Sequence, residues 1–172
     1  MDLRFTTPSL RRLDLSGTEV LVATLALDER PPHGVAGLVD FRLAGRISRL
    51  VRSGFATGTL GEVILVPGKP KLPFDKIVLF GIGATGEFDE RVYQDSVERI
   101  LSTLEGLRAR TAVVELPGRH FGAILPERAA DLLLERAGGR REHDVWTLVE
   151  PPEAQRAITQ HMIQERRRVR AE

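Results

Sequence analysis

The chain alternates short apolar runs with amphipathic stretches. The run VLVATLAL at residues 20–27 is short for a helix and rich in leucine and β-branched residues, which favours a central strand covered on both faces. Similar runs, each followed by glycine or proline, predict further strands at residues 63–66, 76–80 and 111–116. Weaker patterns predict strands nearer the sheet edges at residues 3–5 and 145–149.

The stretches between these runs have helical periodicity. Residues 89–107 place seven apolar side chains on one stripe, with most charges on the other side, and predict the longest amphipathic helix. Residues 126–137 begin with proline and are followed by Gly138 and Gly139, as expected at helix boundaries. A third helix is predicted at residues 37–53, with a break near Gly45. Strands that alternate with helices predict an α/β domain with a mixed, mostly parallel sheet between helix layers.

The last segment, residues 151–172, begins with two prolines and continues as a helix that is rich in arginine. Its apolar stripe is thin, so we expect partial docking on a domain formed by residues 1–150. The basic cluster near its end consists of Arg166, Arg167, Arg168 and Arg170. Cations there complement the helix dipole, and the same cluster is a candidate contact surface for a partner. A nucleic-acid contact is the less favoured interpretation.

Composition narrows the function classes. The 172 residues fit one domain, and 25 basic against 24 acidic side chains give no global field for nucleic acid or anionic membranes. The chain has no cysteine, which excludes disulfides and thiolate chemistry. It has no signal-peptide core and no apolar run of membrane-spanning length, so we expect a soluble cytoplasmic protein. The four histidines form no local zinc motif, and no metal or cofactor is predicted.

The segment GIGATG at residues 81–86 matches G-x-G-x-x-G between a predicted strand and a predicted helix. In dinucleotide folds such glycines let the backbone approach a pyrophosphate at a helix N-terminus. Glu87 and Asp89 place negative charge in that position, and no acidic residue ends a strand at the usual distance. The segment is therefore either a glycine turn or a ligand-binding loop made by Gly81, Gly83, Ala84, Thr85 and Gly86.

A second candidate loop, residues 118–122, follows the predicted strand at 111–116. Loops at the carboxyl ends of strands are where open α/β sheets bind ligands. Arg119 is a candidate clamp for an anion, His120 is a candidate group that titrates near neutral pH, and Gly118 and Gly122 flank them. The alternative is a solvated surface loop.

The stretch from Phe55 to Thr103 resembles the N-terminal domain of the leucyl (cytosol) aminopeptidase family. The residues that carry the resemblance are a phenylalanine and two glycines before a strand, a Gly-x-Gly after a buried strand and an acidic helix start, here Phe55, Gly58, Gly61, Glu62, Gly81, Gly83, Asp89 and Glu90. The similarity extends over about residues 18–165. It implies a three-layer α/β/α macrodomain-like fold, with residues 151–172 resembling the family's interdomain helix.

The family's catalytic signature is not found in this sequence. Its metal-binding domain carries a motif reading N-T-D-A-E-G-R-L, and the nearest string here, residues 103–108, lacks the aspartate. The resemblance therefore implies a domain without peptidase activity. Ligand-binding macrodomains use asparagines and a glycine triplet, whereas residues 27–37 keep only Gly34 and Gly37.

These observations predict a stand-alone, non-catalytic domain that binds a protein partner or associates with itself. The alternative is a module that binds a nucleotide or an ADP-ribose-like compound across the loops at residues 81–86 and 118–122. A further alternative is an accessory subunit of an aminopeptidase. No membrane partner is expected.

Overall fold

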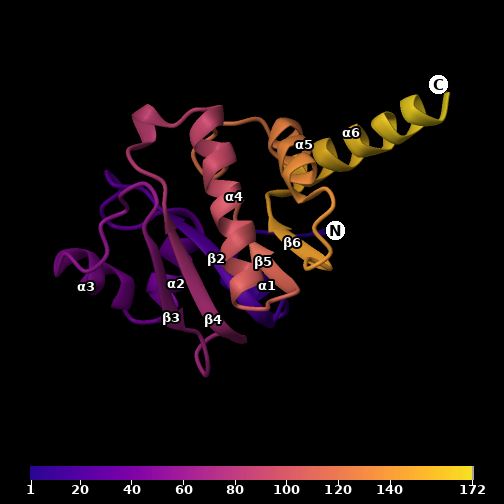
Figure 1. The fold of residues 1–172 in the computed structure, drawn as a ribbon. Coiled ribbons are helices and arrows are strands. Elements are labelled where there is room, and N and C mark those ends of the chain that lie inside the picture. The colour runs from indigo at the N-terminus through magenta and orange to yellow at the C-terminus, as the bar shows by residue number, and fades with distance from the viewer. Residues whose placement is uncertain (172) are drawn as a thin grey trace.

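A computed structural model describes residues 1–171 and shows one sheet between two layers of helices (Figure 1). The sheet has six strands in the order β1-β6-β5-β2-β4-β3, and all neighbours pair in parallel except β3 and β4. The strands are β1 Asp2–Thr6, β2 Thr18–Leu25, β3 Val63–Pro67, β4 Phe74–Gly81, β5 Thr111–Val114 and β6 Val145–Val149. The helices are α1 Leu10–Asp14, α2 Gly34–Arg42, α3 Arg46–Arg52, α4 Glu90–Gly106, α5 Pro126–Ala137 and α6 Pro152–Ala171, with a 3-10 turn at Thr85–Glu87. The predicted mixed, mostly parallel α/β architecture is confirmed.

The two central strands bury both of their faces because successive side chains point to opposite sides of the sheet. Val20 and Val22 of β2 pack with α4 and α5, whereas Leu21 and Ala23 pack with α2 and α3. This explains why the sequence of β2 is a continuous apolar run rather than an alternating one. Of the two strands expected near the edges, β1 lies at the edge and β6 lies one position inside it.

Helix boundaries follow local signals. The Asp89 side chain accepts a hydrogen bond from the Val92 amide and caps α4, and Pro126 begins α5. The predicted break near Gly45 is confirmed: this residue has a φ of 82° and separates α2 from α3. The predicted strand at residues 111–116 ends earlier, at Val114, and α1 was not predicted.

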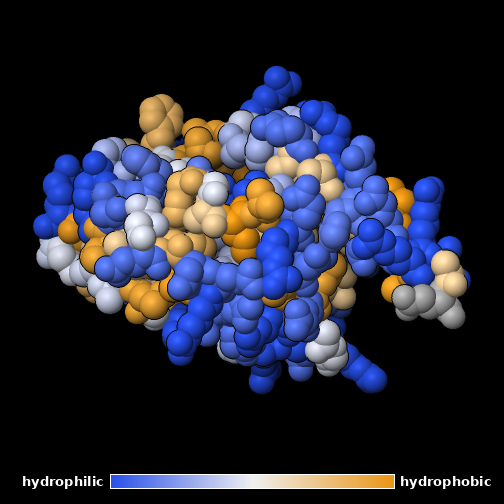
Figure 2. Space-filling model, turned by 90° about the horizontal axis from the view of Figure 1, so that it is seen from above, coloured by the Kyte–Doolittle hydropathy of each residue, from blue (hydrophilic) through white to orange (hydrophobic). Residues whose placement is uncertain are grey.

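Helix α6 contacts α5 and then projects away from the body of the domain (Figure 1). Only Ala154 and Ile158 of this twenty-residue helix are buried. From above, α6 forms an arm at the right on which hydrophilic side chains surround a few apolar ones (Figure 2). Within residues 1–171, no helix has the length and apolar character needed to cross a membrane.

Candidate functional site

Both loops predicted to bind a ligand lie at the end of the sheet where the carboxyl ends of the parallel strands meet. Residues 81–86 follow β4 and residues 118–122 follow β5. The loops meet through aromatic rings: a Cβ added at Gly118 would lie 2.5 Å from the Phe88 ring, and the Phe88 and Phe121 centroids are 5.6 Å apart. The segments that carry the two loops are therefore neighbours in the structure.

The amides of the glycine loop are largely used to pack the loop itself. The N–H groups of residues 81–83 donate to carbonyl groups of two other segments: those of Gly58 and Glu62 in the loop before β3, and that of Leu25 in β2. The Thr85 amide and hydroxyl donate to the Asp28 carboxylate at 2.9 and 2.6 Å, which lowers the pKa of Asp28. Gly86 borders open space. A phosphate bound here would compete with these internal acceptors, and ligand binding by this loop stays a prediction.

The Arg119 guanidinium, the predicted anion clamp, is already paired. It donates to both carboxylate oxygens of Glu150 at 2.9 and 3.0 Å, and to the Ile124 carbonyl at 2.7 Å. The Arg119 and Glu150 side chains are only 11% and 2% exposed. The charge of Arg119 is thus neutralised inside the protein, and an external anion would have to displace Glu150.

His120 lies between two carboxylates. Its Nε2 atom is 2.8 Å from Glu29, which also lies 2.7 Å from Nδ1 of His33. Its Nδ1 atom is buried without a hydrogen-bond partner, 3.8 Å from Glu115. Glu29 therefore orients the imidazole ring from one side.

Glu115 is a buried carboxyl group beside His120. Its Oε2 atom accepts a hydrogen bond from the Val35 amide at 2.8 Å, in the first turn of α2, and its Oε1 atom accepts one from the Thr24 hydroxyl. Burial raises the pKa of Glu115, and the nearby His120 charge partly opposes that shift. The protein's own carboxyl group thus occupies the helix N-terminus, a position that attracts phosphate in nucleotide-binding folds.

A small cavity of about 270 Å³ opens beside this cluster. It is slightly smaller than the range of roughly 300–1,000 Å³ that is usual for small-molecule sites. Its wall at Gly34 has no room for a side chain, since an added Cβ there would lie 2.5 Å from Glu115. The cavity is lined by Pro8, Gly34, Glu115, Arg119, His120, Val149, Glu150 and Pro151.

Sequence reasoning identified Arg119 and His120 but missed their acidic partners. Glu115 follows β5 directly and Glu150 follows β6 directly, so both stand where parallel strands end. Both could have been identified from the sequence, because each is a charged residue immediately after a buried strand. Glu29 lies within a longer loop and had no comparable signal. Gly122 donates its N–H to the Arg119 carbonyl and borders open space.

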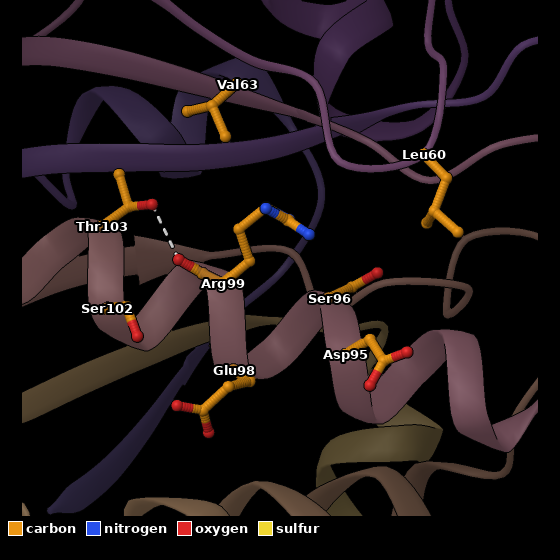
Figure 3. A pocket seen from close by; sticks show the side chains of 8 residues that line it. All are labelled: Leu60, Val63, Asp95, Ser96, Glu98, Arg99, Ser102 and Thr103. Carbon is orange, nitrogen blue, oxygen red and sulfur yellow. Dashed lines mark hydrogen bonds between the residues drawn. The ribbon is translucent and has the colours of Figure 1, made fainter.

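A larger cavity, of about 590 Å³, lies on another side of the molecule between β3 and α4 (Figure 3). Leu60 and Val63 form its wall on the β3 side, whereas Arg99 and Ser96 point into it from α4. Asp95 and Glu98 also line the cavity, with their carboxyl groups directed away from Leu60 and Val63 (Figure 3). Sequence analysis did not predict this groove.

The C-terminal arginines lie apart from both loops, on the projecting part of α6 (Figure 1). Arg166, Arg167, Arg168 and Arg170 are all exposed, and Arg168 pairs with Glu165 at 2.8 Å. Among residues 1–171, no three His, Asp or Glu side chains are grouped so as to hold a metal ion.

Comparison with known sequences gives a consistent result. The model of the cytosol aminopeptidase family N-terminal domain matches residues 21–136. A probable cytosol aminopeptidase of Pseudomonas syringae is 32% identical over 99 residues, which is 58% of this chain and 20% of that protein. The corresponding protein of Halorhodospira halophila is 32% identical over 105 residues, 61% of this chain and 20% of its own. The chain thus spans about a fifth of the length of these relatives.

Solved structures show the same fold at low sequence identity. The macrodomain of Mycobacterium tuberculosis DarG has a TM-score of 0.67 at 16% identity and covers 87% of this chain and 98% of its own. A variant of tomato leucine aminopeptidase has a TM-score of 0.63 at 15% identity, over 94% of this chain and 35% of its own. The predicted macrodomain-like architecture is therefore confirmed.

Proposed function

The chain belongs to the cytosol aminopeptidase family through that family's N-terminal domain, and from this premise we propose that it is a protein-association module without peptidase chemistry of its own. The match lies within the region expected to fold as a domain, residues 1–150, and the relatives extend far beyond it. Helix α6 would then be the segment through which the domain contacts a partner.

The observation that carries this proposal is the projection of α6 from the domain. Beyond Ile158, Ile163 and Val169 leave 46% and 73% of their surfaces exposed. A single helical segment of this length is marginally stable in water without tertiary packing. Contact of this outer half with a partner would supply the packing that the domain itself does not.

The charge of the outer half of α6 indicates the chemistry of the partner. Residues 161–171 carry four arginines and one glutamate, and the arginines are exposed. An acidic surface with an apolar strip is complementary to this arrangement. Two partners are candidates: another copy of the chain, or the catalytic region of an aminopeptidase. In the latter case the chain would be an accessory subunit. A cytoplasmic location accords with the names of the relatives.

The proposal is tested by light scattering of the purified chain over a wide concentration range, alone and mixed with the catalytic region of a cytosol aminopeptidase. We expect a mass above 19.1 kDa in at least one case. Reversing Arg166, Arg167 and Arg168 to glutamate should abolish that assembly. Reversing the exposed Arg11, Arg12 and Arg52 changes net charge equally and should preserve it. A monomeric mass under both conditions would reject the proposal.

A second candidate function is binding of a nucleotide-like ligand at the carboxyl ends of the parallel strands. It is favoured by the 270 Å³ cavity and by the unpartnered Nδ1 atom of His120, one of its lining residues. Titration calorimetry with ADP-ribose would detect a dissociation constant of about 100 μM, roughly 5.5 kcal/mol. Gly86→Glu is the test variant: it places a negative charge in the glycine loop, and its Cβ meets open space, so the fold is not disturbed. Heat that persists unchanged in this variant would argue against a site at the glycine loop.

A further inference from the structure

The outer edge of β3 carries no charged side chain, and its proline, Pro67, stands only at the last position. β3 is the last strand of the sheet, and its sequence VILVP contains no lysine or other charge that would discourage pairing. Val63 and Leu65 are 40% and 48% exposed on the face toward α4, whereas Ile64 and Val66 are buried on the opposite face. Natural edge strands are usually blunted by charges, bulges or covering segments, so this edge is suited to accept another strand.

The backbone of β3 has hydrogen-bonding groups available for such a strand. The Gly81 amide donates to the Glu62 carbonyl at 2.8 Å, and Ile64 is registered with Leu79 of β4. In an antiparallel pair, alternate residues direct both their N–H and C=O groups to the partner strand. Val63 and Leu65 therefore direct theirs outward, to the open side of the sheet.

The groove beside this edge has its own polar groups. The Arg99 guanidinium lies over Gly61, 3.4 Å from where a Cβ would stand, and within residues 1–171 it has no carboxylate within ion-pair distance. The Ser96 hydroxyl, from a residue only 4% exposed that lines the groove, has no hydrogen-bond partner. Glu98 is held by Arg140, which leaves the positive charge of Arg99 uncompensated.

We propose that the β3 edge and the β3–α4 groove bind an extended peptide segment of a partner protein, with an apolar side chain against Leu60 and Val63 and a carboxylate on Arg99. The peptide would add a seventh strand to the sheet, and backbone hydrogen bonds to Val63 and Leu65 would supply its affinity. This inference rests on the proposed association role but uses a surface other than α6.

A peptide fits this surface better than a second copy of the chain. Pairing of two β3 strands would bring a second Arg99 to the joined grooves, and the carboxyl groups of Asp95 and Glu98, which line each groove, are directed away from Leu60 and Val63 (Figure 3). A partner segment with an acidic residue compensates the charge and satisfies the open strand edge together.

The inference is tested by selecting binders from a display library of random-sequence peptides on the purified chain. Leu65→Pro blocks strand addition because the proline ring replaces an outward N–H, leaving the β3–β4 ladder intact. Arg99→Ala removes the cation, and Arg91→Ala, an exposed arginine on the same helix, is the matched control. Circular dichroism of each variant establishes that it is folded.

We expect the selected peptides to alternate apolar residues and to contain an acidic residue. Their affinity should fall about tenfold or more in Arg99→Ala, be lost in Leu65→Pro and be unchanged in Arg91→Ala. Absence of enrichment, or binders insensitive to both groove variants, would overturn the inference, as would a doubled mass of the chain that Leu65→Pro abolishes. Charge reversal of Arg166–Arg168 should leave peptide binding intact, which separates this result from failure of the α6 proposal.

Discussion

The Arg119–Glu150 ion pair offers the sharpest test of what stabilises the loops at the carboxyl ends of the strands. Sequence reasoning offers Arg119 as a candidate anion clamp or as a solvated loop residue, whereas the structure places it in a buried pair with Glu150 and a hydrogen bond to Ile124. Substitution Arg119→Ala would leave the Glu150 carboxylate, 2% exposed, without its partner. The variant should therefore lose stability whether or not any ligand binds.

The size of this loss follows from burial. Removing one partner of a buried ion pair costs about 3–5 kcal/mol because an uncompensated charge remains. For a chain of this length each kcal/mol lowers the melting temperature by about 2–4 °C, so the midpoint should fall by roughly 6–20 °C. Neutralising both partners, Arg119→Met with Glu150→Gln, removes the unpaired charge and should recover more than half of the loss.

The assay is thermal and urea unfolding of the variants at pH 7, followed by circular dichroism. Arg128→Ala is the control, because Arg128 makes the same two-point contact with Glu90 while both side chains are about half exposed. We expect a much smaller change in this control, since solvent screens an exposed pair. If Arg119→Ala lowers the free energy of unfolding no more than Arg128→Ala does, the Arg119–Glu150 pair is not a structural contact.

Three further predictions concern other parts of the fold. Because burial raises the pKa of Glu115 above 4.5, the folded state holds a proton that the unfolded chain releases; the contribution of Glu115 to stability should be fully present below pH 4.5 and be lost as pH rises. Glu115→Gln should flatten that part of a pH titration of unfolding, and an unchanged slope would contradict the assignment. Gly118→Ala should cost about 1–3 kcal/mol more than Gly122→Ala in urea unfolding, because only the first Cβ meets a ring, Phe88, while both residues have positive φ; equal losses would exclude the clash. Deleting residues 163–172 should change the free energy of unfolding by less than about 0.5 kcal/mol, since Ala154, Ile158 and the contact of His161 with Asp131 remain; a large loss would show that the outer part of α6 is integral to the fold.

Much of the fold was predictable from local patterns. The run at residues 20–27 predicted β2 because a strand buried on both faces has no polar positions, and Gly45 predicted the break between α2 and α3. The short helix α1 was missed because its five residues are too few to show a period. The strand at 111–116 was predicted too long, since Glu115 lies beyond the ladder and bonds to Val35 and Thr24 instead.

The sequence by itself determined the family, the α/β class, the position of the glycine loops after strands and the arginine-rich end of α6. These depend on residues close together in the chain, whose spacing records the periods of strand and helix. Only the tertiary structure decided that Arg119 is paired with Glu150, that His120 lies between Glu29 and Glu115, and that Arg99 faces an open strand edge. Contacts between residues tens of positions apart depend on strand order and helix placement, which the local pattern does not encode.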